Sequence, residues 1–202
     1  LASSGYVRIS QGDAVALLDV ASIGPDYIPG HAHADNLSFE FSLFGQRLLV
    51  NSGTSLYEPG LERLRQRGTA AHNTVQIDGE NSSEVWASFR VAKRAHPFDL
   101  QTRVKDEFVV AQCSHDGYQR LAGRNIHQRR WRLDNHSLKI TDTIEGRFQS
   151  AAARYHLHPE IQVNGDNELQ LPNGKTVKYM SEGASLRIEK TTWHPEFGKT
   201  IE

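Results

Sequence analysis

Cysteine, methionine and net charge are all scarce in this chain of 202 residues. The single cysteine, Cys113, excludes an intrachain disulfide and any metal site built from several thiolates. Lysine and arginine number 23 against 24 for aspartate and glutamate, so the chain lacks the basic excess with which sequence-blind nucleic-acid binders displace counterions. No apolar run approaches the roughly 20 residues of a membrane helix, and no signal-peptide pattern opens the chain. We therefore expect neither a nucleic-acid partner nor a membrane span.

The start of the sequence is also unusual for a complete protein. It begins at Leu1, and its only methionine is Met180. Because a complete gene product begins with methionine, we expect this chain to be part of a longer protein.

Helical periodicity is almost absent, whereas polar and apolar residues often alternate. One short helix is predicted near Gly60–Gln66, where two leucines lie three residues apart. Short alternating runs are separated by turn sequences such as Asp78-Gly79 and Asn173-Gly174. We predict an all-β fold, an antiparallel multi-sheet β-sandwich with at most one short helix, formed as a single domain over residues 1–202. The predicted strands are Tyr6–Ser10, Ala14–Val20, Leu37–Phe44, Arg47–Val50, Thr74–Asp78, Phe108–Ser114, His127–Leu133, Ser137–Ile144, Ala152–His158, Thr176–Met180 and Ser185–Lys190.

The densest group of metal-binding and acid–base side chains lies in Gly30-His31-Ala32-His33-Ala34-Asp35. If this segment is extended, His31, His33 and Asp35 share one face, and the apolar continuation of that face enters the core. The alanine spacers leave room around the imidazole rings, which suits a site at the edge of a sheet. The alternative is a surface His-x-His pair without function.

The spacing argues against a cupin, the most familiar β-fold with a His-x-His metal site. A cupin has a glycine, five residues, His-x-His, three or four residues and then a glutamate. Here Gly30 directly precedes His31, and six residues separate His33 from Glu40. A cupin-like enzyme is therefore disfavoured.

Several further segments, taken together with the histidines, carry a family resemblance. In this order and at this spacing they resemble the C-terminal β-domain of the heparinase II/III-like polysaccharide lyases, particularly bacterial members associated with capsule and exopolysaccharide systems. The resemblance covers roughly Ser4 to Phe197, with its specific motifs between Gly30 and Arg90. These motifs are His31-Ala32-His33-Ala34-Asp35, the Phe39–Val50 hairpin, Asn51-Ser52-Gly53-Thr54, Thr69-Ala70-Ala71-His72-Asn73-Thr74-Val75 and Asp78-Gly79 through Phe89-Arg90.

The resemblance implies a two-domain enzyme, in which an N-terminal α/α toroid packs against the β-sandwich and the substrate groove runs between them. Such lyases cleave uronic-acid polysaccharides, for example heparan sulfate or alginate. The uronate carboxylate is neutralised, a base removes the proton at C5, and an acid protonates the departing oxygen at C4. The tyrosine acid/base and the carboxylate-neutralising asparagine come mainly from the toroid. The resemblance also implies a periplasmic or secreted location.

The same resemblance assigns roles to four residues of this chain. His31 matches a catalytic histidine of the groove, and His33, Asn51 and His72 match the ligands of a structural zinc. Asn51 departs from the family, because characterised members have aspartate there. The amide removes a negative charge, so we expect zinc to be weakly bound or absent. Asp35, on the face of His33, is the first candidate for a replacement charge.

The three matched ligands are not close in a simple extended hairpin. A plain hairpin places Asn51 opposite Glu40, which is seven residues from His33, or about 23 Å of extended chain. The ligands meet only if Gly30–Asn36 bends back over the sheet.

Three alternating arginines, Arg63, Arg65 and Arg67, suit an acidic polysaccharide, because guanidinium groups pair bidentately with carboxylate and sulfate. All three share a face on a strand, whereas only Arg63 and Arg67 do so on a helix. The alternative is a solvated face balanced by Glu58 and Glu62.

Two functions from different classes follow. The leading hypothesis is the C-terminal domain of a polysaccharide lyase, inactive alone, with acidic polysaccharide and its own toroid as partners. The alternative is a non-catalytic β-sandwich that binds polysaccharide or plays a structural role in a capsule or exopolysaccharide system. A toroid that places a tyrosine and an asparagine opposite His31 distinguishes the first from the second.

Overall fold

Nearly all regular structure in the computed structural model is β-strand; residues 4–25, 27–28 and 30–202 are described. The helical elements are α1 (Leu61–Arg67) and a short 3-10 helix, η1 (Thr69–Ala71). The strands are β1 (Tyr6–Gln11), β2 (Ala14–Asp19), β3 (Phe39–Leu43), β4 (Gln46–Leu49), β5 (Val75–Ile77), β6 (Glu84–Trp86), β7 (Arg90–Ala92), β8 (Pro97–Val104), β9 (Phe108–His115), β10 (Ile126–Asp134), β11 (Leu138–Glu145), β12 (Ala151–Ala153), β13 (Gln162–Asn164), β14 (Glu168–Gln170) and β15 (Thr176–Lys178). The predicted all-β fold with one short α-helix is confirmed.

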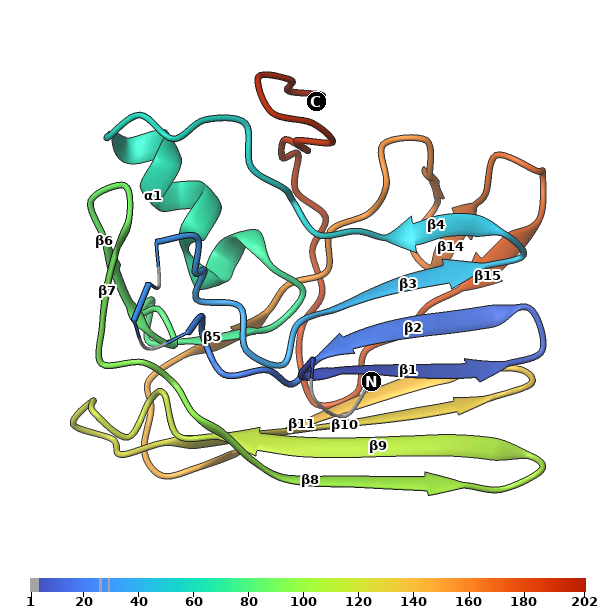
Figure 1. The fold of residues 1–202 in the computed structure, drawn as a ribbon. Coiled ribbons are helices and arrows are strands. Elements are labelled where there is room, and N and C mark those ends of the chain that lie inside the picture. Colours follow the sequence, from blue (N-terminus) through green and yellow to red (C-terminus); the bar gives the residue numbers. More distant parts are fainter. Residues whose placement is uncertain (1–3, 26, 29) are drawn as a thin grey trace.

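The strands form several antiparallel sheets. Two four-stranded sheets have the orders β1-β2-β3-β4 and β11-β10-β9-β8, and β13-β14-β15 forms a third. Two-stranded pairs are β12-β5 and β6-β7. The two large sheets lie one above the other, with α1 and the β6-β7 hairpin beyond one end (Figure 1). This arrangement is the predicted multi-sheet sandwich.

The core lies between these sheets and follows from the alternation in the sequence. In β2, Ala16 and Leu18 have no exposed surface, whereas Leu17 between them faces solvent. They belong to one apolar cluster with Trp131 and Leu133 of β10, which are also buried. Burying one such aliphatic side chain contributes about 1.5–3 kcal/mol, so the two sheets are held together mainly by these inward faces.

The structure differs from the predicted strands where burial does not alternate. β8 was not predicted, although Phe98, Leu100 and Val104 alternate with polar residues; these apolar side chains are exposed and form no face of the core. Ser185–Lys190 alternates but forms no strand, and each of its residues is exposed. The prediction of a strand there is wrong, because alternation without an apolar face to bury and a neighbouring strand to pair with does not stabilise one.

A buried polar chain crosses the sheet β8–β11. His115 and His127 lie directly opposite each other on β9 and β10, and their ring nitrogens are 3.1 Å apart. His127 Nε2 lies 2.7 Å from Asp142 Oδ1, and Asp142 also accepts two hydrogen bonds from Arg129. Burial is the main cause that lowers the pKa of His115 and of His127, although Asp142 opposes it. Both rings are therefore neutral at pH 7.

We expect the free energy of unfolding to fall as the pH drops below about 6.5, the ordinary pKa of histidine. There the unfolded chain binds protons that folded His115 and His127 exclude, at a cost of about 1.4 kcal/mol per pH unit for each ring. Asp19 acts in the opposite direction, because burial raises its pKa to about 6. Urea denaturation between pH 7.5 and 5 measures the net effect of these groups on the free energy of unfolding. Asp19→Asn should steepen the decline, and constant stability over this range would contradict the interpretation.

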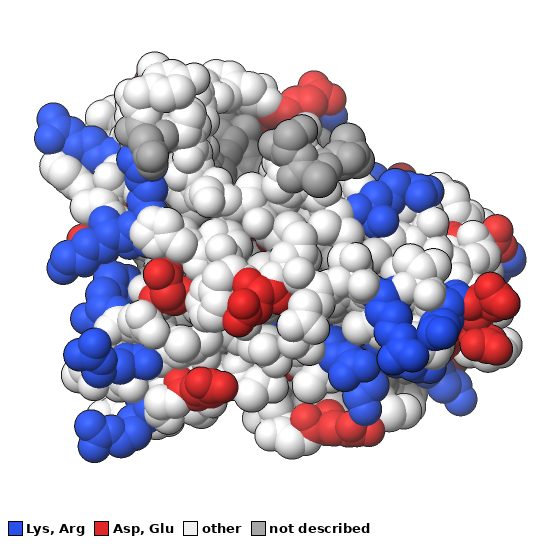
Figure 2. Space-filling model, turned by 60° about the horizontal axis from the view of Figure 1, so that its bottom comes forward, with Lys and Arg blue, Asp and Glu red and all other residues white. Residues whose placement is uncertain are grey.

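The described part of the chain contains no helix long and apolar enough to cross a membrane. Its surface charges are mixed: basic and acidic side chains both occur on the face in Figure 2. This face is therefore not uniformly basic, and an anionic partner would bind it through particular basic residues.

Candidate functional site

The histidine segment is a loop at the end of the sandwich, between β2 and β3, and not an extended strand. Residues 30–38 contain turns and bends, and Leu37 has a φ of 59°, outside the β region. β3 begins only at Phe39. The segment Gly30–Asn36 is therefore bent, as it has to be if the predicted metal ligands are to meet.

Hydrogen bonds to the segment around α1 and η1 hold this loop in place. Arg67 Nε donates to the Ala32 carbonyl at 3.0 Å, and the Arg67 carbonyl accepts from the Ala34 N–H at 2.9 Å. The Thr69 hydroxyl donates to the Ala34 carbonyl at 2.8 Å. Two of the sequence motifs are thus joined directly, and the loop has a defined conformation.

His31 lies at the surface in a cluster with two aromatic rings. Its ring centroid lies 5.3 Å from that of Tyr57 and 6.0 Å from that of Phe89, both in edge-to-face geometry. The centroids of Tyr57 and Phe89 are 5.7 Å apart, so the three rings form a triangle. The imidazole is exposed and therefore accessible to a ligand, and the two rings restrain it on one side. Tyr57 was not predicted; its only signal was an aromatic residue shortly after the Asn51–Thr54 motif.

The structure corrects the prediction for two of the three arginines. On α1, Arg63 and Arg67 share the inner face and have no exposed surface, so they do not offer guanidinium groups to a polysaccharide. Arg67 Nη1 and Nη2 donate to backbone carbonyls of the loop after β6 and of β7. Arg63 Nε donates to the Ser88 carbonyl, and its guanidinium carbon lies 5.1 Å from the Tyr57 ring centroid. Only Arg65 is exposed, and it is paired with Glu62 at 2.6 Å.

His33, Asp35 and His72 come together. One ligand atom from each lies within 4.8 Å of those of the other two. The His33 and His72 rings are 5.2 Å apart. The loop brings the first two residues to the third, which follows η1. The convergence of His33 and His72 was expected, but Asp35 enters the group where the family resemblance placed Asn51.

The donors of this group suit a metal ion. His72 has no exposed surface, and neither of its ring nitrogens has a hydrogen-bond partner within the described ranges. The backbone of Gln66 lies near enough to favour the charged ring slightly, but it makes no well-formed hydrogen bond. Because a buried polar group without a partner is costly, an orphaned imidazole points to a missing ligand. Two imidazoles and a carboxylate are donors that zinc accepts.

Burial and neighbouring charges keep both imidazoles neutral, which is the form that binds metal. Burial, followed by the charges of Arg63 and Arg67, lowers the pKa of His33 to about 3. Burial also holds the pKa of His72 well below its ordinary value, and the nearby His33 and His156 add to this effect. Neither ring is protonated at neutral pH.

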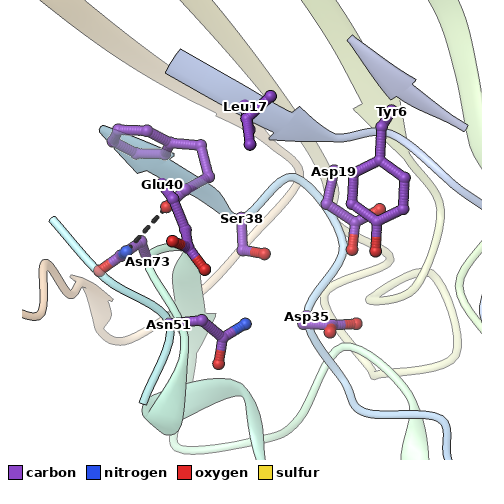
Figure 3. A pocket seen from close by; sticks show the side chains of 9 residues that line it. Tyr6, Leu17, Asp19, Asp35, Ser38, Glu40, Asn51 and Asn73 are labelled. Carbon is purple, nitrogen blue, oxygen red and sulfur yellow. Dashed lines mark hydrogen bonds between the residues drawn. The ribbon is translucent and has the colours of Figure 1, made fainter. Parts of the chain in front are cut away.

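A cavity of about 150 Å³ lies beside the group, and Asn51 and Asp35 line it from two different segments (Figure 3). Asn51 Oδ1 accepts a hydrogen bond from the Gly53 N–H at 3.1 Å. Asp19 and Tyr6 lie near each other in the same cavity. Burial, and then the charge of Asp19, raises the pKa of Asp35 well above the usual range. The cavity is thus lined by the Asn51 amide and by Asp35, the carboxyl group that also lies near the two imidazoles.

The chain matches one protein-family model over its whole length, residues 1–202: "Heparinase II/III-like, C-terminal". A search of curated proteins found no match.

Solved structures with the same fold include a heparan sulfate lyase and a heparinase III. The heparan sulfate lyase HepC from Pedobacter heparinus superposes with a TM-score of 0.70 at 17% identity, covering 93% of this chain and 29% of that chain. A heparinase III, the BT4657 gene product, superposes with a TM-score of 0.72 at 21% identity, covering 98% of this chain and 31% of that chain. At these identities the likeness shows the fold. The chain spans less than a third of the length of either structure.

Proposed function

The chain belongs to the heparinase II/III-like family, whose C-terminal domain model it matches throughout, and we propose that it is the C-terminal domain of a polysaccharide lyase. The proposed reaction is β-elimination on a uronic-acid-containing polysaccharide. The observation that carries the proposal is His31, an exposed imidazole at the tip of a loop fixed by buried hydrogen bonds. A general acid or base needs both access to substrate and a fixed position, and His31 has both.

In this proposal His31 lies at the reacting uronate and exchanges a proton with it as the C5–H and C4–O bonds break. Tyr57 and Phe89 pack against the imidazole and restrain it. Arg63, beneath them, contributes by packing against both rings rather than by touching substrate. The product carries a double bond between C4 and C5 of the uronate.

The remaining catalytic groups are proposed to lie outside this chain. The chain spans 29–31% of the two structures described above. An N-terminal α/α toroid in the same protein would supply the tyrosine acid/base, the asparagine that neutralises the carboxylate, and the other wall of the groove. A periplasmic or secreted location fits such a protein, because polymeric substrate lies outside the cytoplasm.

We also propose that His33 and His72 bind zinc in a structural role. A metal ion there would link the His31 loop to the segment after η1, and so would fix His31 from below. The support for this site is the orphaned imidazole of His72 beside His33.

A non-catalytic carbohydrate-binding role is the second candidate, and the exposed aromatic residues favour it. Tyr57, Trp86 and Phe89 are all partly exposed around the His31 loop, and the Arg90 guanidinium lies 4.7 Å from the Trp86 ring centroid. Aromatic faces of this kind bind sugar rings without cleaving them.

We expect the isolated 202-residue chain to be inactive on any polysaccharide and the full-length protein to be active. Proton transfer requires both acid and base within hydrogen-bond reach, and half of the groove is missing from the chain alone. Ultraviolet absorbance of unsaturated uronate, measured with both proteins over a panel of uronic-acid polymers, is the test. Turnover by the isolated chain, abolished by His31→Ala, would contradict the proposed division of roles. Binding without turnover by the full-length protein would favour the second candidate.

A further inference from the structure

Two buried arginines lie close to the histidine loop. Arg67 donates to the carbonyl of Ala32, next to His33, and Arg63 packs against Tyr57, which contacts His31. A dication added beside them requires a negative charge at bonding distance, because an uncompensated buried charge is strongly destabilising. The metal site therefore needs a carboxylate more than an ordinary site would.

Asn51 does not meet this need. Its side chain is neutral, and its Oδ1 already accepts a hydrogen bond from the Gly53 N–H. An amide oxygen is also a poorer zinc ligand than a carboxylate. If Asn51 were the third ligand, the ion and the two buried arginines would share one region without an anion.

Asp35 has the required position, and it supplies the charge when the ion displaces its proton, because metal ligands bind in their deprotonated form. It lies two residues after His33 on the same fixed loop, and one of its carboxylate oxygens is within 4.8 Å of a ring nitrogen of both His33 and His72. The backbone on either side of Ala34 is held by Arg67 and Thr69, so this position is not the chance result of a mobile loop.

We propose that Asp35 is the anionic ligand of the site and takes the place of the carboxylate that Asn51 lacks. The inference rests on the proposed zinc site at His33 and His72. Zinc then binds through two imidazoles and one carboxylate despite Asn51, and the weak binding expected from the sequence does not occur. Because positions 35 and 51 line the same cavity (Figure 3), one carboxylate at either position serves the ion.

The test is zinc affinity of the full-length protein at neutral pH, measured by metal analysis and by competition with a chromogenic chelator. Asp35→Asn should weaken zinc binding at least about 100-fold, since even residues that only orient a ligand change affinity by about 10–100-fold. The double variant Asp35→Asn/Asn51→Asp should recover most of the loss. Glu40→Gln is the matched control, because Glu40 lines the same cavity but pairs with Arg47 at 2.9 Å; it should change affinity by less than about threefold.

The outcomes separate the inference from the zinc site on which it rests. If His33→Ala loses zinc while Asp35→Asn keeps it, Asp35 is not a ligand and only this inference fails. If the native protein binds no zinc, or His33→Ala binds it as well as the native protein, the site itself fails. The melting temperature of each metal-free variant checks folding, and Asp35→Ser replaces Asp35→Asn if the amide variant does not fold.

Discussion

His31→Ala is expected to lower the rate of polysaccharide cleavage by the full-length protein about 100- to 10,000-fold, the range that a general acid or base contributes. The loss should appear in kcat, because the imidazole takes part in proton transfer in the transition state and contributes little to binding of the polysaccharide. The exposed ring makes no buried contact that its removal would leave as a cavity, so stability should change by less than about 1 kcal/mol. Initial rates of absorbance increase over a range of substrate concentrations measure both parameters.

His136 provides the matched control for this variant. It is also an exposed histidine, but it lies in the turn between β10 and β11, where its backbone N–H donates to Asp134 Oδ1 at 2.9 Å. His136→Ala should therefore leave kcat and KM unchanged within experimental error. A His31→Ala variant that keeps more than a tenth of the native kcat would show that another group moves the proton.

Arg129→Met is expected to reduce the free energy of unfolding by about 3–5 kcal/mol, the usual cost of breaking a buried ion pair. Arg129 has no exposed surface and donates to Asp142 through Nε at 2.7 Å and Nη2 at 2.9 Å. Its Nη1 donates to the carbonyls of Leu37 and Asn73. Removing the guanidinium leaves two carbonyls without this donor, and it leaves the Asp142 carboxylate with neutral His127 in place of a positive charge. Urea denaturation at pH 7.5 is the measurement.

Arg130, the next residue on β10, is the control for this change. Its side chain faces solvent, so Arg130→Met should alter the free energy of unfolding by less than about 0.5 kcal/mol. Equal effects of the two substitutions would mean that the buried pair does not hold β10 to the loop that carries the site.

The sequence predicts strands correctly where buried and exposed side chains alternate. The prediction fails where they do not. Strands β1–β4 of one large sheet and β9–β11 of the other were predicted because they turn apolar side chains to the core, as Ala16 and Leu18 of β2 do. β6 and β7 are three-residue strands with little burial, so they leave almost no pattern. Short exposed strands are defined by their hydrogen-bonded neighbours, which a single sequence does not reveal.

The candidate site was predicted through the family resemblance, but the burial of its residues was not. The resemblance assigned His31, His33 and His72 to the site, and the structure brings the last two together. The arginines were misjudged, because the partners that bury Arg63 and Arg67 are backbone carbonyls, which carry no signal in the sequence. A charged residue is buried when such carbonyls converge on it, and this depends on tertiary structure.

The buried chain of His115, His127 and Asp142 was missed for a related reason. Its residues are separated by 12 and 15 positions and meet only through strand register. His115 and His127 are directly paired across β9 and β10, and Asp142 joins them from β11. Knowledge of the register between β9, β10 and β11 would have revealed that these three residues are neighbours. Their spacing in the sequence does not reveal it.

Mass spectrometry of the products formed by the full-length protein from a uronic-acid polysaccharide tests the central claim most directly. Proposed β-elimination breaks the C4–O bond without adding water, so each new non-reducing end should be an unsaturated uronate and the product masses should sum to that of the substrate. His31→Ala should form these products at least about 100-fold more slowly. Fragments that each carry one added water and a saturated end would show hydrolysis, and they would contradict the assignment of this domain to a lyase.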